Sequence, residues 1–288
     1  MGNTESAIRG IADTARWVAI YRALETERPD AVFRDPYARR LAGKRGVDIM
    51  AAVPPSARKA AWAFVARTYN FDHFIQEQVR GGVTLVVNLA AGMDTRPYRL
   101  ALPRTLRWVE VDQPELLAEK TAAMAGVEPV CALERIPLDL ADEAGRRALF
   151  RRLDAEGRNT LVVTEGLLVY LTEEQVGALA GDLAACSTFR SWVTDLMSPA
   201  LLRIVQKDWG RTLREAGAPL QFGPEAGPAF FPPFGWRAAE LRGAITTAGQ
   251  LNRLPLLLRV LSTLPGSGTF HPRRPWSGVC LLTREHSA

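Results

Sequence analysis

The most informative part of the chain is Thr84-Leu-Val-Val-Asn-Leu-Ala-Ala-Gly-Met-Asp-Thr-Arg96, followed by Arg107-Trp-Val-Glu-Val-Asp112. Residues 84–89 form a short β-branched and apolar run, which is typical of a parallel strand covered on both faces. The small residues Ala90, Ala91 and Gly92 come next and leave the backbone open to a ligand. The pattern therefore predicts a strand, a tight loop and a second strand that ends in carboxylates.

The distance from Gly92 to Asp112 is 20 residues. An acidic residue about that far past a glycine loop, at the carboxyl end of the next strand, is placed to accept hydrogen bonds from ribose hydroxyls in an open α/β sheet. Asp112 is the candidate for this role, and Glu110, which faces the same side of the strand, is the second choice. Asp112 is also suited to cap a helix that begins near Pro114.

The loop differs from the dinucleotide fingerprint. That fingerprint needs three glycines for the approach of a pyrophosphate, whereas this loop has Gly92 alone and carries Asp94 where a later glycine would stand. A carboxylate there disfavours a pyrophosphate. S-adenosylmethionine has no phosphate and carries positive charges, so it tolerates this carboxylate better.

Several runs together resemble the leucine carboxyl methyltransferase family, in particular its bacterial S-adenosylmethionine-dependent branch. They are Asn88-Leu-Ala-Ala-Gly-Met-Asp-Thr95, Val109-Glu-Val-Asp112, Thr164-Glu-Gly-Leu-Leu-Val-Tyr-Leu171, Asp13-Thr-Ala-Arg-Trp-Val-Ala, Arg34-Asp-Pro-Tyr-Ala, Arg67-Thr-Tyr-Asn-Phe-Asp and Phe234-Gly-Trp236. The resemblance covers most of the chain. It implies an α/β class I methyltransferase fold, Rossmann-like and doubly wound, with a mostly parallel sheet, an N-terminal helical cap and a lid insertion.

The resemblance also implies roles for particular side chains. Asp139 and Leu140 would meet the adenine, although by itself Asp139 is better interpreted as a turn residue. Arg67 would pair with the carboxylate of S-adenosylmethionine, for which a guanidinium fork is suited. Glu165 would pair with the amino group, and Tyr170 would orient the substrate. Ala90 departs from the family, which usually has glycine at this place beside the cofactor.

Hydrophobic patterning divides the chain into an N-terminal helical cap, residues 1–80, and a core, residues 81–288. The core is predicted to have strands near 84–90, 107–112, 160–166, 190–196 and 277–283. Helices are predicted near 54–79, 200–217 and 237–248. The segment near 199–235 ends in a run rich in proline, glycine and phenylalanine and is interpreted as a lid or substrate-pocket insertion.

Composition limits the classes of partner. The chain has 288 residues, 47% of them hydrophobic, with a net charge of +5. Its arginines are scattered and no aromatic-interleaved basic motif occurs, so nucleic acid is not expected as a partner. No apolar run is long enough to span a bilayer, so we expect a cytoplasmic protein that does not bind membranes. Cys131, Cys186 and Cys280 lie far apart and are expected to be reduced core residues, with no metal site.

Methyl transfer needs little side-chain chemistry beyond in-line alignment and exclusion of water. An ionised carboxylate acceptor needs no base, whereas a phenol or alcohol does, and His73 is the histidine nearest to the predicted pocket. Eight aromatic residues suit an apolar small-molecule pocket or a core: Trp62, Tyr69, Phe71, Phe222, Phe230, Phe231, Phe234 and Trp236.

The function expected is an S-adenosylmethionine-dependent O-methyltransferase for a carboxylate or hydroxyl of a small, aromatic or polyketide-like molecule. A methyltransferase for protein C-terminal carboxylates, an NAD-linked oxidoreductase and a non-catalytic cofactor-binding protein stay open.

Overall fold

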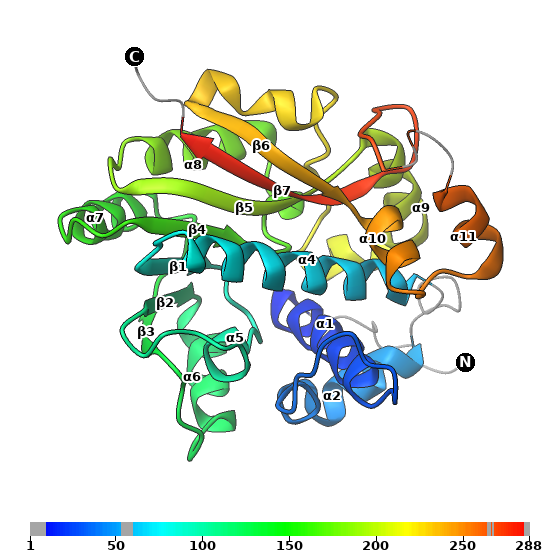
Figure 1. Ribbon diagram of the computed structural model, residues 1–288, viewed down its shortest axis with the longest axis horizontal. Helices are drawn as coiled ribbons and strands as arrows, with labels where there is room; N and C mark the ends of the chain where they lie inside the picture. Colours follow the sequence, from blue (N-terminus) through cyan, green and yellow to red (C-terminus); the bar gives the residue numbers. More distant parts are fainter. Residues whose placement is uncertain (1–9, 53–59, 264–265, 267, 285–288) are drawn as a thin grey trace.

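In the computed structural model, the described residues are 10–52, 60–263, 266 and 268–284. Their central feature is a seven-stranded sheet of order β3-β2-β1-β4-β5-β7-β6 (Figure 1). Strands β1 to β5 run parallel, and β7 is antiparallel to both β5 and β6. The order reverses between β1 and β4, which places a crevice at the carboxyl ends of these strands. The doubly wound α/β prediction is confirmed.

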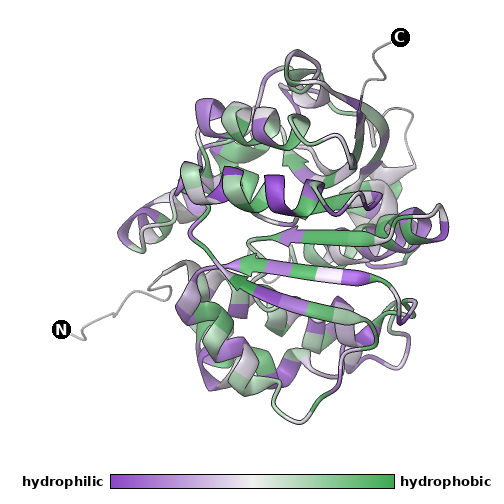
Figure 2. Ribbon diagram, turned by 90° about the vertical axis from the view of Figure 1, so that its left-hand side faces the viewer, coloured by the Kyte–Doolittle hydropathy of each residue, from purple (hydrophilic) through white to green (hydrophobic). Residues whose placement is uncertain are grey.

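The strands are β1 (Leu85–Leu89), β2 (Arg107–Asp112), β3 (Ala132–Pro137), β4 (Thr160–Thr164), β5 (Phe189–Met197), β6 (Trp236–Gly243) and β7 (Ser277–Arg284). Strands β1, β2, β4, β5 and β7 lie close to the five predicted ranges, whereas β3 had no predicted range and β6 was not predicted as a strand. Every residue of β1 and of β4 is buried, as expected for strands covered on both faces. Figure 2 shows helices on both sides of strands that carry hydrophobic and hydrophilic residues.

The α-helices are α1 (Ile11–Thr26), α2 (Ala38–Ala52), α4 (Ala61–Arg80), α5 (Arg96–Arg99), α6 (Pro114–Ala123), α7 (Glu143–Asp154), α8 (Glu173–Ala184), α9 (Pro199–Glu215), α10 (Ala244–Gln250) and α11 (Leu256–Ser262). Helices α1, α2 and α4 precede β1, helices α5 to α9 alternate with the strands from β1 to β6, and α10 and α11 lie between β6 and β7. None of the helices within the described ranges is long and apolar enough to cross a membrane.

Alternate residues of β1 face two separate cores. Leu85, Val87 and Leu89 pack with residues of α7 and α8 in one cluster. Val86 packs with residues of α4 in the other cluster, on the opposite face of the sheet. The period of two along the strand thus directs each side chain to one of the two helical layers.

Local sequence explains where several helices begin. Thr172 and Gln175 form a capping box at α8, Asp142 caps α7, and Ser198 caps α9 directly before Pro199. Pro114 occupies the first turn of α6, which starts immediately after β2. These starts place the amino ends of α6, α8 and α9 near the carboxyl edge of the sheet.

One predicted element is wrong. Residues 237–248 were expected to form a single helix, but 236–243 form strand β6 and only the remainder is helical, as α10. Alanine and glutamate in β6 favour a helix locally, yet pairing with β7 supplies the backbone hydrogen bonds of an edge strand. Gly243 ends the strand and caps α10.

The N-terminal helices and the segment after β5 pack in different ways. α1 and α2 pack together, whereas α4 packs directly on the face of the sheet (Figure 1). α9 corresponds to the helix predicted near 200–217, and 3₁₀ turns at Gly227–Phe230 and Pro232–Phe234 follow it. The division into a cap and a core, and the description of 199–235 as a lid, remain predictions.

Candidate functional site

The loop after β1 has a constrained backbone. Ala90 and Gly92 both adopt left-handed conformations, with φ of 52° and 48°. The Gly92 N–H donates to Oδ2 of Asp112 over 2.7 Å, while the Gln113 N–H donates to Oδ1 over 2.8 Å. Asp112 therefore fixes the loop and the start of α6 at the same time. A carboxylate offers about four acceptor positions, so two remain for a ligand.

Asp94 also holds the loop after β1 in place through its side-chain hydrogen bonds. Its Oδ2 accepts from the Asn88 side-chain amide and from the Arg96 guanidinium, and its Oδ1 accepts from the Arg96 backbone N–H. Burial raises the pKa of Asp94, but the Arg96 guanidinium outweighs this and lowers the pKa well below its ordinary value. Because Asp94 is paired in this way, its charge does not by itself decide which nucleotide the loop accepts.

A cavity of about 980 Å³ opens at the carboxyl edge of the sheet. Its lining includes all eight candidate residues: Arg67, Ala90, Gly92, Asp112, Asp139, Leu140, Glu165 and Tyr170. Arg67 comes from α4, Tyr170 comes from the 3₁₀ turn Leu168–Tyr170, and the other six lie at or just after the ends of β1 to β4. The sequence pattern therefore located one continuous site, while the role of each residue in it stays a prediction.

The cavity has two chemically different regions. The strand-end region is lined by Ala90, Gly92, Asp112, Asp139, Leu140 and Glu165. The apolar region is lined by Trp17, Val169, Tyr170, Met197, Val205, Leu213 and Leu220, which pack in one hydrophobic cluster. α9 and the chain following it contribute three of these, so part of the predicted insertion does line the pocket.

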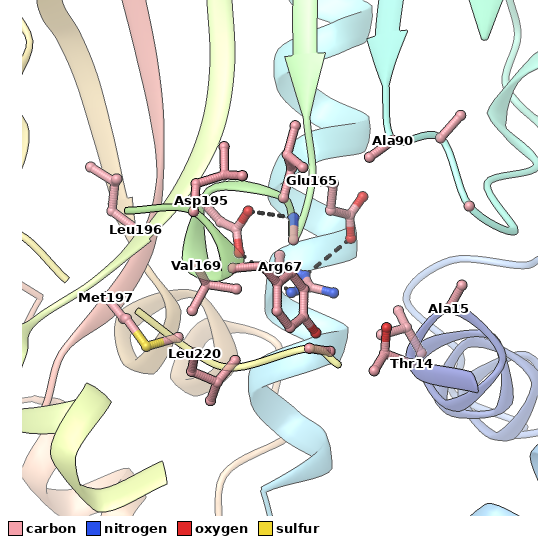
Figure 3. A pocket seen from close by; sticks show the side chains of 18 of the residues that line it. Thr14, Ala15, Arg67, Ala90, Glu165, Val169, Asp195, Leu196, Met197 and Leu220 are labelled. Atoms are coloured by element: carbon pink, nitrogen blue, oxygen red, sulfur yellow. Dashed lines mark hydrogen bonds and ion pairs between the residues drawn. The ribbon is translucent and has the colours of Figure 1, made fainter. Parts of the chain in front are cut away.

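Arg67 lies where the two regions meet (Figure 3). Its Nε donates to Oε1 of Glu165 over 3.1 Å, and its Nη1 donates to Oδ2 of Asp195 over 3.4 Å. Glu165 also pairs with Arg96 over 2.7 Å. Burial raises the pKa of Glu165, but Arg96 and Arg67 outweigh burial and hold that pKa below its ordinary value. Glu165 is therefore held as a carboxylate.

Tyr170 belongs to the apolar region. Its hydroxyl hydrogen-bonds with the side chain of Thr14 of α1, and burial raises the pKa of the phenol. The phenol is therefore neutral near pH 7 and able to donate a hydrogen bond. This position beside Arg67 suits a residue that orients an acceptor.

The position of Asp139 is compatible with both of its predicted roles, that of a turn residue and that of a residue near the adenine. Its Oδ1 accepts from the Ala141 backbone N–H over 2.9 Å, as a turn residue does, and it also lines the cavity beside Leu140. Glu110, the second choice for ribose, is excluded from the cavity. It is fully buried and pairs with Lys120 and Arg135.

Most of the predicted pocket aromatics are core residues. Trp62 lines the cavity, but Phe222, Phe230, Phe231, Phe234 and Trp236 belong to the main hydrophobic core. Phe71 belongs to the core cluster on the α4 face of the sheet, while the rings of Tyr69 and His73 are tilted by 30° with centroids 3.9 Å apart. Aromatic content alone could not separate pocket from core, because both are apolar.

His73 does not line the cavity, and its Nδ1 lies 2.8 Å from the Tyr69 carbonyl oxygen. Nδ1 of His271 accepts a hydrogen bond from the Arg273 backbone N–H over 3.1 Å, and His286 is outside the described residues. The three cysteines are free and buried, as predicted, and burial raises the pKa of each thiol. Over the described ranges, no cluster of three or more His, Cys, Asp or Glu side chains is arranged to hold a metal.

Sequence reasoning missed Asp195 and Arg96, which both line the cavity. Asp195 follows a short run with a central Trp-Val pair, Ser191-Trp-Val-Thr, much as Asp112 follows Trp-Val-Glu-Val. That repeated signal was available. Arg96 offered none, because its partners Asp72, Asp94 and Glu165 come from three separate elements.

Solved structures share this architecture. A "putative methyltransferase" from Thermobifida fusca YX matches with a TM-score of 0.57 and 15% identity, over 97% of this chain and 96% of that chain. A duf574 family protein from Streptomyces avermitilis matches with a TM-score of 0.55 and 12% identity, over 94% and 97%. At these identities the likeness establishes the fold, which is that of class I methyltransferases.

Two curated relatives are more similar in sequence than these solved structures are. The chain is 37% identical over 185 residues to a "Putative S-adenosyl-L-methionine-dependent methyltransferase" from Streptomyces coelicolor, which is 59% of this chain and 63% of the relative. A protein with the same description from Mycobacteroides abscessus is 34% identical over 179 residues, which is 59% of this chain and 58% of the relative. The matched part thus spans about three fifths of these relatives. The profile described as leucine carboxyl methyltransferase matches residues 15–184. The chain belongs to the leucine carboxyl methyltransferase family.

Proposed function

We propose that the protein is an S-adenosylmethionine-dependent O-methyltransferase that acts on a small, apolar molecule. The observation that carries the proposal is the convergence of Arg67, Gly92, Asp112 and Glu165 on one cavity that continues into an apolar region. The descriptions of the two sequence relatives support the choice of cofactor.

The strand-end region fits the parts of this cofactor. Asp112 has acceptor positions left for the ribose hydroxyls, and Asp139 with Leu140 would flank the adenine. Arg67 and Glu165 pair with each other, so the zwitterionic amino-acid end of the cofactor would find a cation and a carboxylate side by side. Ala90 and Gly92 leave the loop backbone close to the ligand. The bound cofactor would supply a methyl group on a sulfonium, which needs no metal for transfer.

The residues of the apolar region would align the acceptor and keep water away. Trp17, Val169 and Leu220 provide a dry wall, and the neutral Tyr170 hydroxyl would orient the acceptor oxygen. Alignment and desolvation are the main contributions that a protein makes to methyl transfer. An apolar wall favours a compact organic molecule over the polar C-terminal tail of a protein.

A labelled-methyl assay tests the proposal. The purified protein would be incubated with methyl-labelled S-adenosylmethionine and either a panel of aromatic acids and phenols or peptides that end in leucine. We expect label in the extracted small molecules, and a lower rate in Tyr170→Phe than in the parent protein. Label on the peptides alone would instead establish a protein carboxyl methyltransferase. Binding of the cofactor without any transfer would favour a non-catalytic binding protein.

A further inference from the structure

Two carboxylates contact Arg67 from opposite sides of its guanidinium. Figure 3 shows Glu165 on the side of Ala90, and Asp195 on the side of Leu196 and Met197. The side chain of Asp195 is 16% exposed and lines the cavity. Asp195 therefore belongs to the apolar region, whereas Glu165 belongs to the strand-end region.

The cations of the cavity are already engaged. Arg67 is shared between two carboxylates. Arg22 donates to Asp35 and to the Met93 carbonyl, and Arg96 donates to Asp72 and Asp94. Arg146 of α7 donates to Asp182 and to the Leu140 carbonyl. Arg22 and Arg96 lie toward the loop after β1, away from the apolar region.

The charged side chains that β5 and α9 contribute to the described lining are both acidic, namely Asp195 and Asp208. An anionic group placed in the apolar region would therefore meet carboxylates and no uncommitted cation of the described lining. A neutral group meets no such penalty, because like-charge repulsion acts only on an ionised acceptor.

The two oxygens of Asp195 differ in their partners. Oδ1 accepts from the Gly166 backbone N–H over 2.7 Å, which fixes the carboxylate plane. Among the described residues, the hydrogen-bond donor to Oδ2 is Arg67, at the long distance of 3.4 Å. A carboxylate oxygen accepts two hydrogen bonds, so Oδ2 retains capacity for a ligand hydroxyl. Burial also raises the pKa of Asp195, and this effect outweighs the opposing effect of Arg67. The raised pKa makes the Asp195 carboxylate a better proton acceptor.

We propose that the methyl acceptor is a neutral hydroxyl on an apolar molecule, that Asp195 receives its proton, and that the same carboxylate excludes carboxylic acids. The proposal rests on the function proposed above. The acceptor oxygen forms a bond to the methyl carbon while the bond from sulfur to that carbon breaks, and its electron pair stays on sulfur. The hydroxyl proton moves to Oδ2 of Asp195, so the products are a methyl ether, S-adenosylhomocysteine and a protonated Asp195.

Two probes of the same ring size test the charge argument. The protein is first titrated with S-adenosylhomocysteine by calorimetry, and the saturated protein is then titrated with 2-naphthol and with 2-naphthoate at about pH 7.5. We expect the neutral probe to bind at least tenfold more tightly than the anion. Asp195→Asn, which keeps an oxygen for the Gly166 N–H, should narrow this ratio at least threefold by improving the binding of naphthoate.

Asp208→Asn is the matched control, because Asp208 lies on the exposed side of α9 and should change the ratio less. Naphthoate binding as tightly as naphthol in the parent protein, or binding of neither probe, would overturn the proposal. An unchanged ratio in a folded Asp195→Asn variant would also overturn it. If that variant does not fold, the ratio of the two probe affinities in the parent protein alone supports or overturns the proposal. Failure of S-adenosylhomocysteine to bind in the first titration would instead refute the proposed function.

Discussion

Ala90 occupies a left-handed conformation that costs a non-glycine residue roughly 1–2 kcal/mol. Glycine would remove this strain, at the expense of a more flexible unfolded chain. We therefore expect Ala90→Gly to raise the free energy of unfolding by about 0.5–1 kcal/mol, measured by urea denaturation. Ala91 is buried and its φ is not positive, so Ala91→Gly should destabilise the protein. Loss of stability in both variants would contradict the strain argument.

Arg67 tests the amino-acid end of the proposed cofactor site. Arg67→Met keeps bulk but removes the guanidinium, so the affinity for S-adenosylmethionine should fall tenfold or more. The affinity for 5′-methylthioadenosine, which lacks the amino-acid carboxylate, should change little. Both affinities are measured by calorimetry, with Arg67→Lys as a variant that retains the charge. Equal losses for the two ligands would show that Arg67 acts only through its contacts with Glu165 and Asp195.

Helix α8 contains two glycines in different surroundings. A methyl group added at Gly177 would lie 2.7 Å from Cζ of Phe234, whereas one added at Gly181 would meet nothing within 4 Å. Gly177→Ala should therefore destabilise the protein by about 1–3 kcal/mol through overpacking. Gly181→Ala should stabilise it by about 0.5–1 kcal/mol, since alanine is the better helix former. Thermal unfolding of the two variants checks this contrast, and equal melting temperatures would refute it.

The strands show what the sequence predicts well and where prediction fails. Strands β1, β2, β4 and β5 were recognised because each is a mostly buried run with β-branched residues and a polar residue at, or within two positions of, its carboxyl end. The strand β6 was not recognised, since its stability comes from pairing with β7 and not from its own composition. Elements that depend on a distant partner escape a local pattern.

The same distinction applies to the site. Gly92 and Asp112 could be predicted together because their spacing follows from one strand, loop and strand unit. The contact of Arg67 with Asp195 joins positions 128 residues apart, and no local spacing predicts it. Arg96 was missed for the same reason. Motifs thus locate the cavity, while the ion pairs that tune it require the tertiary structure.

Acid should destabilise the protein as a whole. Burial raises the pKa values of Asp35 and Asp94, but neighbouring arginines outweigh burial and lower both below the ordinary 3.8. The unfolded state takes up protons first, so this stabilisation is complete above about pH 5 and is lost progressively as the pH falls further. Chemical denaturation at about pH 5, 4 and 3 should show a decreasing free energy of unfolding.

The variant Asp94→Asn should weaken this pH dependence. The pKa of Asp195 is shifted upward, which acts in the opposite direction, so Asp195→Asn should leave the acid sensitivity equal or greater. The two variants together distinguish a carboxyl whose pKa is lowered on folding, Asp94, from one whose pKa is raised, Asp195. A steeper acid response in Asp94→Asn would contradict the assignment of Asp94 as a paired carboxylate.

The central claim is that the cavity at the strand ends holds S-adenosylmethionine. Titration calorimetry with S-adenosylhomocysteine and, separately, with NAD⁺ tests it most directly, on the parent protein and on Asp112→Ala. The account predicts one S-adenosylhomocysteine per chain and no binding of NAD⁺. It also predicts affinity for S-adenosylhomocysteine weaker by about 1–3 kcal/mol in a folded Asp112→Ala variant. Binding of NAD⁺ in place of S-adenosylhomocysteine, or full affinity in Asp112→Ala, would contradict it.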